Sequence, residues 1–399
     1  MNTEQEKTAD LVESVQRPAL LVLAGGILGM MVAMGIGRFA FTPILPLMQR
    51  DLGMSHGLAG WLASLNYVGY LSGALLCAIR PMVLRSSVVN VSALIASIGT
   101  TLLMGATHLP LAWGLLRLVA GFASAILFVV IAIEVTETMQ RSSHSRWNSA
   151  LYGGIGLGIA LSGAVVPLLD RLGGWSVAWY GMGALAIGLA IIGVTVAGKR
   201  QSSLDVKAGA AHASGTLSGM VRLSFVYLLE GFGYIISATF LVTMIAHTPG
   251  LSRFAPWSWV AVGLAAAPST IIWQQIANRI GVRPTLTMAY LLQACGILLS
   301  SIAATVFTAG LAAIIFGGTF LGIVALVMAE GGRRAGSEGR RAAAILTVCF
   351  GLGQVVGPPL AGLLADKQGF TLPLILAGSL VALGGILVAT DSGFSKKQI

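Results

Sequence analysis

The stretch PLAWGLLRLVAGFASAILFVVIAIEVT, residues 110–136, indicates the fold class of this chain. It contains only two charged residues, Arg117 and Glu134. As a helix it would extend about 40 Å at 1.5 Å per residue, and the hydrocarbon core of a bilayer is about 30 Å thick. The stretch is therefore long enough and apolar enough to cross a membrane.

The rest of the chain has the same composition. Of its 399 residues, 56% are hydrophobic and 10% are charged, whereas a soluble domain has about 25% charged residues. This excludes a soluble enzyme and a disordered protein. Apolar segments occur at 18–48, 57–79, 88–107, 110–136, 147–169, 175–197, 221–247, 256–277, 285–307, 309–330, 342–365 and 370–390. The sequence therefore predicts an all-α integral membrane protein with twelve transmembrane helices.

A polar stretch rich in Ser, Ala and Gly divides these segments into two sets of six. Such a composition is typical of a flexible connector. The predicted organisation is a tail at 1–17, a six-helix bundle at 18–198, a connector at 199–220, a second six-helix bundle at 221–390 and a tail at 391–399.

The Lys and Arg residues predict the orientation. Of the 24, 18 lie in predicted loops on the side of the N-terminus, four lie in the opposite loops and two lie inside spans. By the positive-inside rule, both termini of this multi-pass protein face the cytoplasm, and we expect it in a bacterial inner (plasma) membrane. The loops also account for the net charge of +10 without a nucleic-acid partner. The expected partners are the lipid bilayer and a small-molecule substrate, with the chain as a monomer.

The two halves match each other at a constant offset of 196 residues. The matching pairs are Trp61 and Trp257, Gly121 and Gly317, Glu134 and Glu330, and Asp170 and Asp366. At the same offset Gly35 matches Gly231 and Gly37 matches Gly233. Trp, Glu and Asp are rare in this chain, so the sequence predicts two parallel, pseudo-symmetric six-helix repeats. This architecture is typical of alternating-access transporters, whose substrate site lies between the repeats near the middle of the membrane.

Three motifs resemble those of the major facilitator superfamily. ANRIGVRP, residues 277–284, resembles its Asp-Arg-x-Gly-x-Arg loop, with Asn278 in place of the acid, and Arg117-x-x-x-Gly121 resembles its Arg-x-x-x-Gly motif. GIGRFAFTP at 35–43, followed by DLGM at 51–54, is similar to the YbfB/YjiJ branch. The resemblance covers nearly the whole chain. It implies a transporter fold in which spans one, two, five, seven, eight and eleven line a central cavity.

Arg38 and Glu230 lie deep within predicted spans, where a charge costs several kcal/mol, so both are candidate functional residues. The repeat places Tyr234 at the depth of Arg38, one turn from Glu230. If spans one and seven face each other, Arg38 and Glu230 form a pair across the pathway or share it with substrate. Burial of a carboxylate favours its protonated form, so Glu230 is the candidate proton-coupling group. The alternative is a static ion pair that joins two helices.

Arg117 is the second buried cation. The resemblance implies a role in proton coupling or anion binding, and the alternative is an arginine paired with backbone carbonyls. Six weaker polar candidates could hydrogen-bond to substrate or between helices: Asn66, Tyr67, Tyr70, Tyr152, Gln274 and Gln354. Gln293 is in a span that the resemblance makes peripheral, and we expect it to be structural.

Glu134 and Glu330 lie at the cytoplasmic ends of their spans, and Arg141 follows Glu134 in a Glu-x6-Arg spacing like that of sugar porters. We expect both acids to close a cytoplasmic gate by pairing with the basic loop residues Arg80, Arg85, Arg279 and Arg283. The alternative is a pair of solvated helix-end charges worth less than about 1 kcal/mol each.

These features predict a proton-coupled secondary transporter of a small organic solute. Two buried cations against one deep carboxylate favour an organic anion. A proton-driven multidrug or metabolite efflux antiporter is the alternative. A membrane-embedded enzyme is disfavoured because no catalytic set of side chains lies within the spans. No cofactor or metal site is expected, and the proton gradient is the expected driving force.

Overall fold

The computed structural model describes residues 19–142, 144–198 and 220–394, and in these ranges the chain is helical with no strand. Eleven helical segments are long and apolar enough to cross a membrane. The predicted all-α membrane class is confirmed. The predicted tail at 1–17, nearly all of the connector at 199–220 and the end of the chain from residue 395 lie outside the described residues.

The first crossing segment, Ala19–Leu52, contains the short helix η1 (Met31–Ile36) and ends in α2 (Phe41–Leu52). The elements that follow in the first half are α3 (His56–Ile79), η2 (Pro81–Arg85), α4 (Ser87–Met104), α5 (Pro110–Arg141), η3 (Ser145–Tyr152) and α6 (Gly153–Ala197). Those of the second half are α7 (Met220–His247), α8 (Ala255–Ile280), α9 (Val282–Ser301), α10 (Val306–Ala335), η5 (Gly336–Glu338), α11 (Gly339–Gln368) and α12 (Thr371–Ala389).

Local sequence accounts for several helix ends. The hydroxyls of Ser55, Ser86 and Thr305 accept hydrogen bonds from the first turns of α3, α4 and α10, which satisfies backbone N–H groups that have no partner within the helix. Gly53 ends α2 in the left-handed conformation, with φ 65°, which glycine adopts without a steric cost.

The helix α6 contains a break between the predicted spans 147–169 and 175–197. Gly174 has φ 70° and ψ −157°, a conformation available essentially only to glycine. A Cβ atom on Gly181 would lie 2.4 Å from Cδ2 of Leu169. The segment after the break therefore folds back on the segment before it, and α6 consists of two apolar helices joined by a tight turn.

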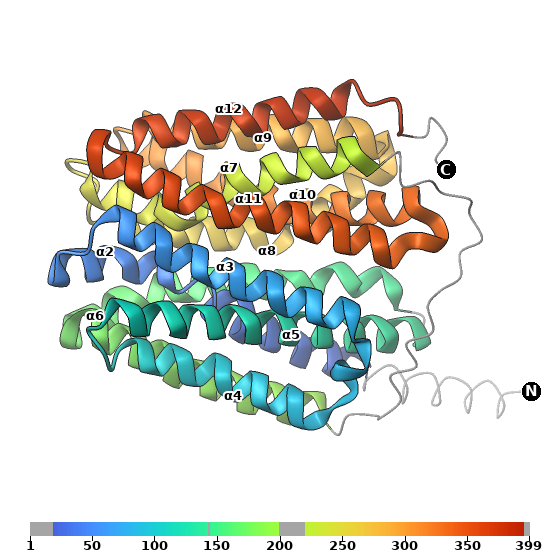
Figure 1. The fold of residues 1–399 in the computed structure, drawn as a ribbon, viewed down its shortest axis with the longest axis horizontal. Helices are drawn as coiled ribbons and strands as arrows, with labels where there is room; N and C mark the ends of the chain where they lie inside the picture. The colour runs from blue at the N-terminus through green and yellow to red at the C-terminus, as the bar shows by residue number, and fades with distance from the viewer. Residues whose placement is uncertain (1–18, 143, 199–219, 395–399) are drawn as a thin grey trace, which may run out of the picture.

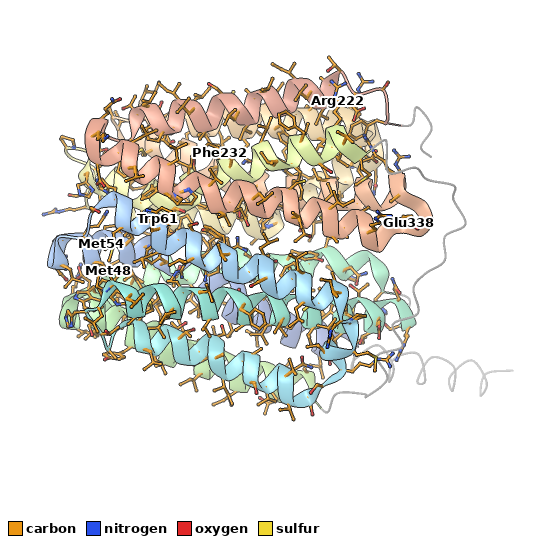
Figure 2. All side chains as sticks on the ribbon, in the orientation of Figure 1. Met48, Met54, Trp61, Arg222, Phe232 and Glu338 are labelled. Atoms are coloured by element: carbon orange, nitrogen blue, oxygen red, sulfur yellow. The ribbon has the colours of Figure 1, made fainter. Side chains whose placement is uncertain are left out.

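The two halves of the chain form two adjacent groups of helices. In Figure 1 the blue-to-green helices α2 to α6 lie below, and the yellow-to-red helices α7 to α12 lie above. Figure 2 shows Met54 and Trp61 at one end of the bundle and Arg222 and Glu338 at the other. We call the end with Arg222, where α12 also finishes, the terminal end, and the opposite one the far end.

The helices α3 and α5 are in backbone contact. A Cβ atom on Gly121 would lie 1.9 Å from the backbone oxygen of Asn66, and one on Gly69 would lie 2.0 Å from that of Leu118. Such distances leave no room for a side chain, so glycine is required at both positions for this helix pair to approach so closely. This contact explains Gly121 in the Arg-x-x-x-Gly motif.

A π-helical turn positions Arg38 in the first span. The N–H of Gly37 donates to the carbonyl of Val32 at 2.9 Å, and the N–H of Phe39 donates to Met34 at 3.1 Å, both five residues back. A regular α-helix bonds four residues back, and π turns of this kind are frequent at functional sites because they re-orient the following side chains. The helix is also broken at 37–40 before α2 begins.

Candidate functional site

A cavity of about 440 Å³ lies between the two halves. The first half contributes residues from span one, α3, α5, η3 and α6, and the second half contributes residues from α7, α8, α10 and α11. Ligand-binding pockets have volumes of roughly 300–1,000 Å³, so the cavity is large enough for a small organic molecule. Its lining extends along the helices toward the terminal end, as far as Gln274 and Ala329.

Arg38 is the one charged side chain among the described residues that line this cavity. It is 4% exposed, and its Nε and Nη2 atoms have no hydrogen-bond partner. Its guanidinium carbon lies 4.4 Å from the ring centroid of Tyr70 and 4.7 Å from that of Tyr67. Aromatic faces attract a cation but supply no opposite charge and no hydrogen-bond acceptor in the plane of the guanidinium, so these two nitrogens remain without a partner.

The second half presents a stack of nearly parallel aromatic rings to the cavity. The ring of Tyr234 lies 5.8 Å from Phe320 at an interplanar angle of 6°, and 5.3 Å from Phe350 at 5°. Tyr227 continues the stack beyond Phe350 at 4.3 Å and 16°. All four of these rings line the cavity. The wall is apolar but carries two tyrosine hydroxyl groups.

Half of the predicted binding residues line the cavity, namely Arg38, Tyr70, Tyr152, Tyr234 and Gln274. Two other predicted residues do not line the cavity but contact residues that do. The side chain of Gln354 donates a hydrogen bond to the hydroxyl of Tyr234, and Tyr67 lies against the guanidinium of Arg38.

Glu230 lies elsewhere than predicted. It is fully buried, and its Oε1 accepts a hydrogen bond of 2.7 Å from Nε2 of Gln293 on α9. Its Oε2 has no hydrogen-bond partner, and it does not line the cavity. The predicted contact with Arg38 is therefore wrong for this conformation, because the carboxyl group is directed into the second half and Arg38 is held by aromatic rings. Gln293, for which a structural role was predicted, is the hydrogen-bond partner of Glu230.

Arg117 and Asn66 lie within the first half, at the contact of α3 and α5. Arg117 is 2% exposed, its Nε donates to the carbonyl of Leu62 at 3.5 Å, and its guanidinium lies 4.6 Å from the ring of Phe41. Asn66 donates to the carbonyl of Arg117 at 2.9 Å. Neither residue lines the cavity, and the contacts are those of the alternative considered for Arg117, pairing with backbone carbonyls.

At the far end the two halves are joined by direct hydrogen bonds. The hydroxyl of Thr42 donates to the carbonyl of Ala238 at 2.6 Å, and that of Ser64 donates to Val355 at 2.7 Å. Thr42 and Ala238 are 196 residues apart, the offset of the predicted repeat. The far end is therefore closed in this structure.

The carboxylate of Asp366 on α11 completes this closure. It accepts hydrogen bonds of 2.8 Å from the backbone N–H groups of both His56 and Gly57, the first residues of α3. A helix N-terminus carries a partial positive charge, so Asp366 attracts α3 across the boundary between the halves. Its counterpart in the repeat, Asp170, accepts instead from Arg50 of its own half, at 2.7 and 3.0 Å.

Asp366→Asn should loosen the far end, because asparagine loses the charge and one of the two acceptors. Asp366 is exposed, so we expect the substitution to destabilise the closed far end by about 1 kcal/mol. This corresponds to a roughly fivefold shift of the equilibrium toward a conformation open at the far end. The measurement is labelling by an impermeant maleimide of a cysteine placed at Met48, which is fully buried at the far end (Figure 2), with Cys77, Cys295 and Cys349 replaced by serine. Asp170→Asn is the matched control and should not increase labelling; equal labelling in the two variants would contradict the role of Asp366.

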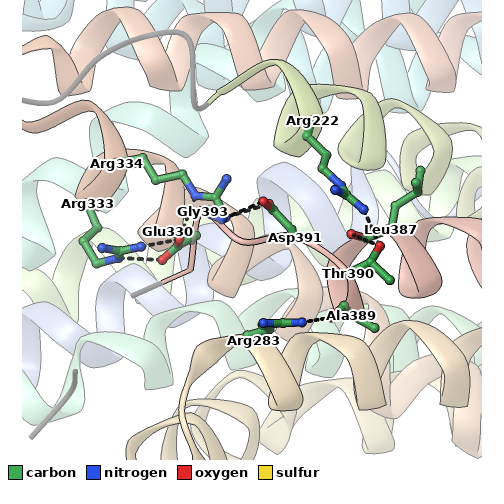
Figure 3. A network of polar contacts seen from close by, with 10 residues as sticks. All are labelled: Arg222, Arg283, Glu330, Arg333, Arg334, Leu387, Ala389, Thr390, Asp391 and Gly393. Carbon is green, nitrogen blue, oxygen red and sulfur yellow. Dashed lines mark hydrogen bonds and ion pairs between the residues drawn. The ribbon is translucent and has the colours of Figure 1, made fainter. Parts of the chain in front are cut away.

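At the terminal end, Glu330 is bound by its own helix (Figure 3). Its carboxylate accepts from Arg333 at 2.5 and 2.7 Å and from Arg334 at 2.7 Å. Arg334 also donates to Asp391, beyond the end of α12, at 2.9 Å. Arg333 and Arg334 lie three and four residues after Glu330 on α10, which is the spacing at which side chains of one helix meet.

The basic residues predicted as gate partners lie apart from this network. Arg283 donates to the carbonyl of Ala389 (Figure 3), so it is not the partner of Glu330. Arg80, Arg85 and Arg279 are exposed at helix ends. The predicted pairing of Glu330 with Arg279 or Arg283 is thus not formed in this conformation.

Glu134 and Arg141, the remaining gate candidates, are on α5. Glu134 lines a separate crevice of about 270 Å³ within the first half, formed by span one, α4, α5 and α6. Arg141 lies 3.6 Å from the carboxylate of Glu137, four residues before it. Glu134 thus lines a crevice within the first half, whereas Glu330 lies in the network with Arg333 and Arg334.

The sequence analysis missed five aromatic residues of the cavity wall: Phe39, Phe128, Tyr227, Phe320 and Phe350. Among the described residues, no cluster of three His, Cys, Asp or Glu side chains could hold a metal ion.

The sequence of residues 30–389 matches the sequence model of a protein family described as "Uncharacterised MFS-type transporter YbfB". The chain belongs to this family. It is therefore a membrane transporter of the major facilitator superfamily and not an enzyme, as the resemblance predicted. A search of curated proteins gave no significant match.

Solved structures of transporters have the same fold. A mutant of the nucleoside transporter NupG superimposes with a TM-score of 0.67 at 17% identity, over 92% of this chain and 98% of that one. The human organic anion transporter MFSD10 (TETRAN) superimposes with a TM-score of 0.63 at 17% identity, over 94% of this chain and 99% of that one. At these identities the likeness establishes the fold alone.

Proposed function

We propose that this protein is a secondary active transporter that moves a small organic anion across the inner (plasma) membrane by alternating access, driven by protons. The observation that carries the proposal is Arg38. It is the one charged side chain in the described lining of a cavity between the two halves, and two of its guanidinium nitrogens, Nε and Nη2, are buried without a hydrogen-bond partner. A cation in such a position binds an anion without first breaking an ion pair.

The conformation supports alternating access. The far end is closed by hydrogen bonds between the halves, and the cavity extends toward the terminal end. With both termini in the cytoplasm, as the Lys and Arg distribution predicts, this arrangement corresponds to an inward-facing state. The break at Gly174 supports counting α6 as two crossings, which with the other segments would make twelve.

The structural neighbours include both a nucleoside transporter and an organic anion transporter, so the anion assignment rests on the positive charge of the cavity lining. For proton coupling, Glu230 remains our candidate because it is the buried carboxylate on α7, the helix that carries Tyr227 and Tyr234 of the cavity wall. The gate roles of Glu134 and Glu330 remain predictions.

The test is transport by the purified protein in proteoliposomes with an imposed pH gradient. We expect radiolabelled organic carboxylates to be moved against their concentration gradient, and a protonophore to abolish this accumulation. The direction relative to the proton flux separates symport from the efflux antiport alternative. Transport that persists with protonophore would contradict proton coupling, and transport of neutral solutes in preference to carboxylates would contradict the anion assignment.

A further inference from the structure

We propose that the substrate of this transporter is a planar aromatic carboxylate, with its carboxylate on Arg38 and its ring against the aromatic wall of α7, α10 and α11. This inference rests on the proposed function and names the substrate class of the same site.

The first step is the geometry of the wall. Phe320, Tyr234, Phe350 and Tyr227 form a continuous stack whose neighbouring rings are within 16° of parallel. The centroid separations of 5.3 and 5.8 Å on either side of Tyr234 show that the rings are displaced sideways, so that part of each face is uncovered. A further planar ring adds to such a stack in the offset or edge-to-face geometry that aromatic pairs prefer.

The second step is the opposite wall, which is also aromatic. The ring centroid of Phe128 lies 6.5 Å from that of Tyr70 and 6.0 Å from that of Tyr152, and all three rings line the cavity from the first half. A substrate between the halves is thus in contact with aromatic rings from both. Closing the two halves around a flat molecule would bring the walls together, and a thicker saturated ring would hold them apart.

The third step is the charge. Arg38 packs against Tyr70 of the first wall, and its ring contacts leave Nε and Nη2 unpartnered. No carboxylate occurs among the described residues that line the cavity. The single positive charge of the cavity lining matches a monoanion, and the planar N–H groups of a guanidinium can bind both oxygens of a carboxylate.

The experiment compares three probes of one skeleton by calorimetric titration of the detergent-purified full chain. These are 2-naphthoate, decahydro-2-naphthoate, which has the same charge on a saturated skeleton, and 2-naphthamide, which has the same rings without the charge. We expect 2-naphthoate to bind about tenfold more tightly than either of the others. If the two carboxylates bind equally and the amide binds weakly, the aromatic inference is overturned and the anion transporter stands. If the amide binds as tightly as 2-naphthoate, both fail.

A pair of variants tests the wall itself. Phe350→Leu removes a ring that lines the cavity, and Phe316→Leu removes a ring that stacks on Phe320 at 13° but does not line the cavity. The first should reduce the preference of 2-naphthoate over its saturated analogue to about twofold, and the second should preserve it. Phe350→Tyr keeps the ring and should also preserve it. Thermal unfolding verifies that each variant is folded. If Phe350→Leu and Phe316→Leu reduce the preference for 2-naphthoate equally, the proposed direct contact of the substrate with Phe350 is overturned.

Discussion

Replacing Arg38 with glutamine should weaken the binding of the proposed anionic substrate about 100-fold, which is the upper part of the range for hydrogen bonds to charged groups. Glutamine keeps polar atoms at this position but removes the one positive charge among the described residues that line the cavity. Arg38→Lys keeps the charge and loses the planar fork, so we expect a smaller loss of about tenfold. Calorimetric titration of each purified variant with a carboxylate ligand measures the effect.

The second buried arginine provides the control. Arg117 is as buried as Arg38 and also lies over an aromatic ring, yet it contacts the backbone of α3 and does not line the cavity. Arg117→Gln should therefore lower the temperature of thermal unfolding while leaving the affinity for the anion within about twofold, because the residue lines no part of the cavity. If instead Arg117→Gln abolishes binding and Arg38→Gln does not, the anchor of the substrate is Arg117 and the proposed site is wrong.

Much of the fold was predictable because a bilayer imposes a strong constraint on sequence. Each crossing helix must be apolar over about 20 residues, and the predicted spans 57–79, 110–136 and 256–277 lie within α3, α5 and α8. The turn within α6 illustrates the same point, since the sequence places it at 169–175 and Gly174 has the conformation of a turn. The rare charged residues were equally informative, and the deepest cation, Arg38, does line the cavity.

Side-chain direction was less predictable. Depth along a helix follows from sequence position, but the direction of Glu230 depends on how α7 is rotated against α9, and no signal in the sequence indicated that Gln293 would face it. The aromatic wall was missed for a different reason. Phe320 and Phe350 are ordinary residues of apolar spans, so nothing distinguishes a ring that lines a cavity from one that faces lipid. Only the packing of α10 and α11 around Tyr234 reveals the stack.

The position of Glu230 is unfavourable for a permanent negative charge. The residue is fully buried, its neighbour Gln293 is neutral, and its second oxygen has no hydrogen-bond partner. A charged carboxylate at the centre of a transmembrane helix costs about 2.5–3.5 kcal/mol or more. We therefore expect Glu230 to hold a proton in the present conformation and to release it in a conformation that brings water or a cation to the carboxyl group.

Glu230→Gln should abolish proton-driven accumulation of substrate while sparing substrate exchange. Glutamine has the shape of the protonated acid and can keep the hydrogen bond to Gln293, so the fold and the binding site should persist, but the residue can no longer carry a proton between the two conformations. Exchange of labelled for unlabelled substrate across the proteoliposome membrane requires no net proton movement and should remain within about threefold of the parent. Glu338→Gln, which removes an exposed carboxylate at the terminal end (Figure 2), is the control and should accumulate substrate normally. Accumulation by Glu230→Gln equal to that of the parent would show that Glu230 and Gln293 only join α7 to α9, and the proton would then have to be carried by another group.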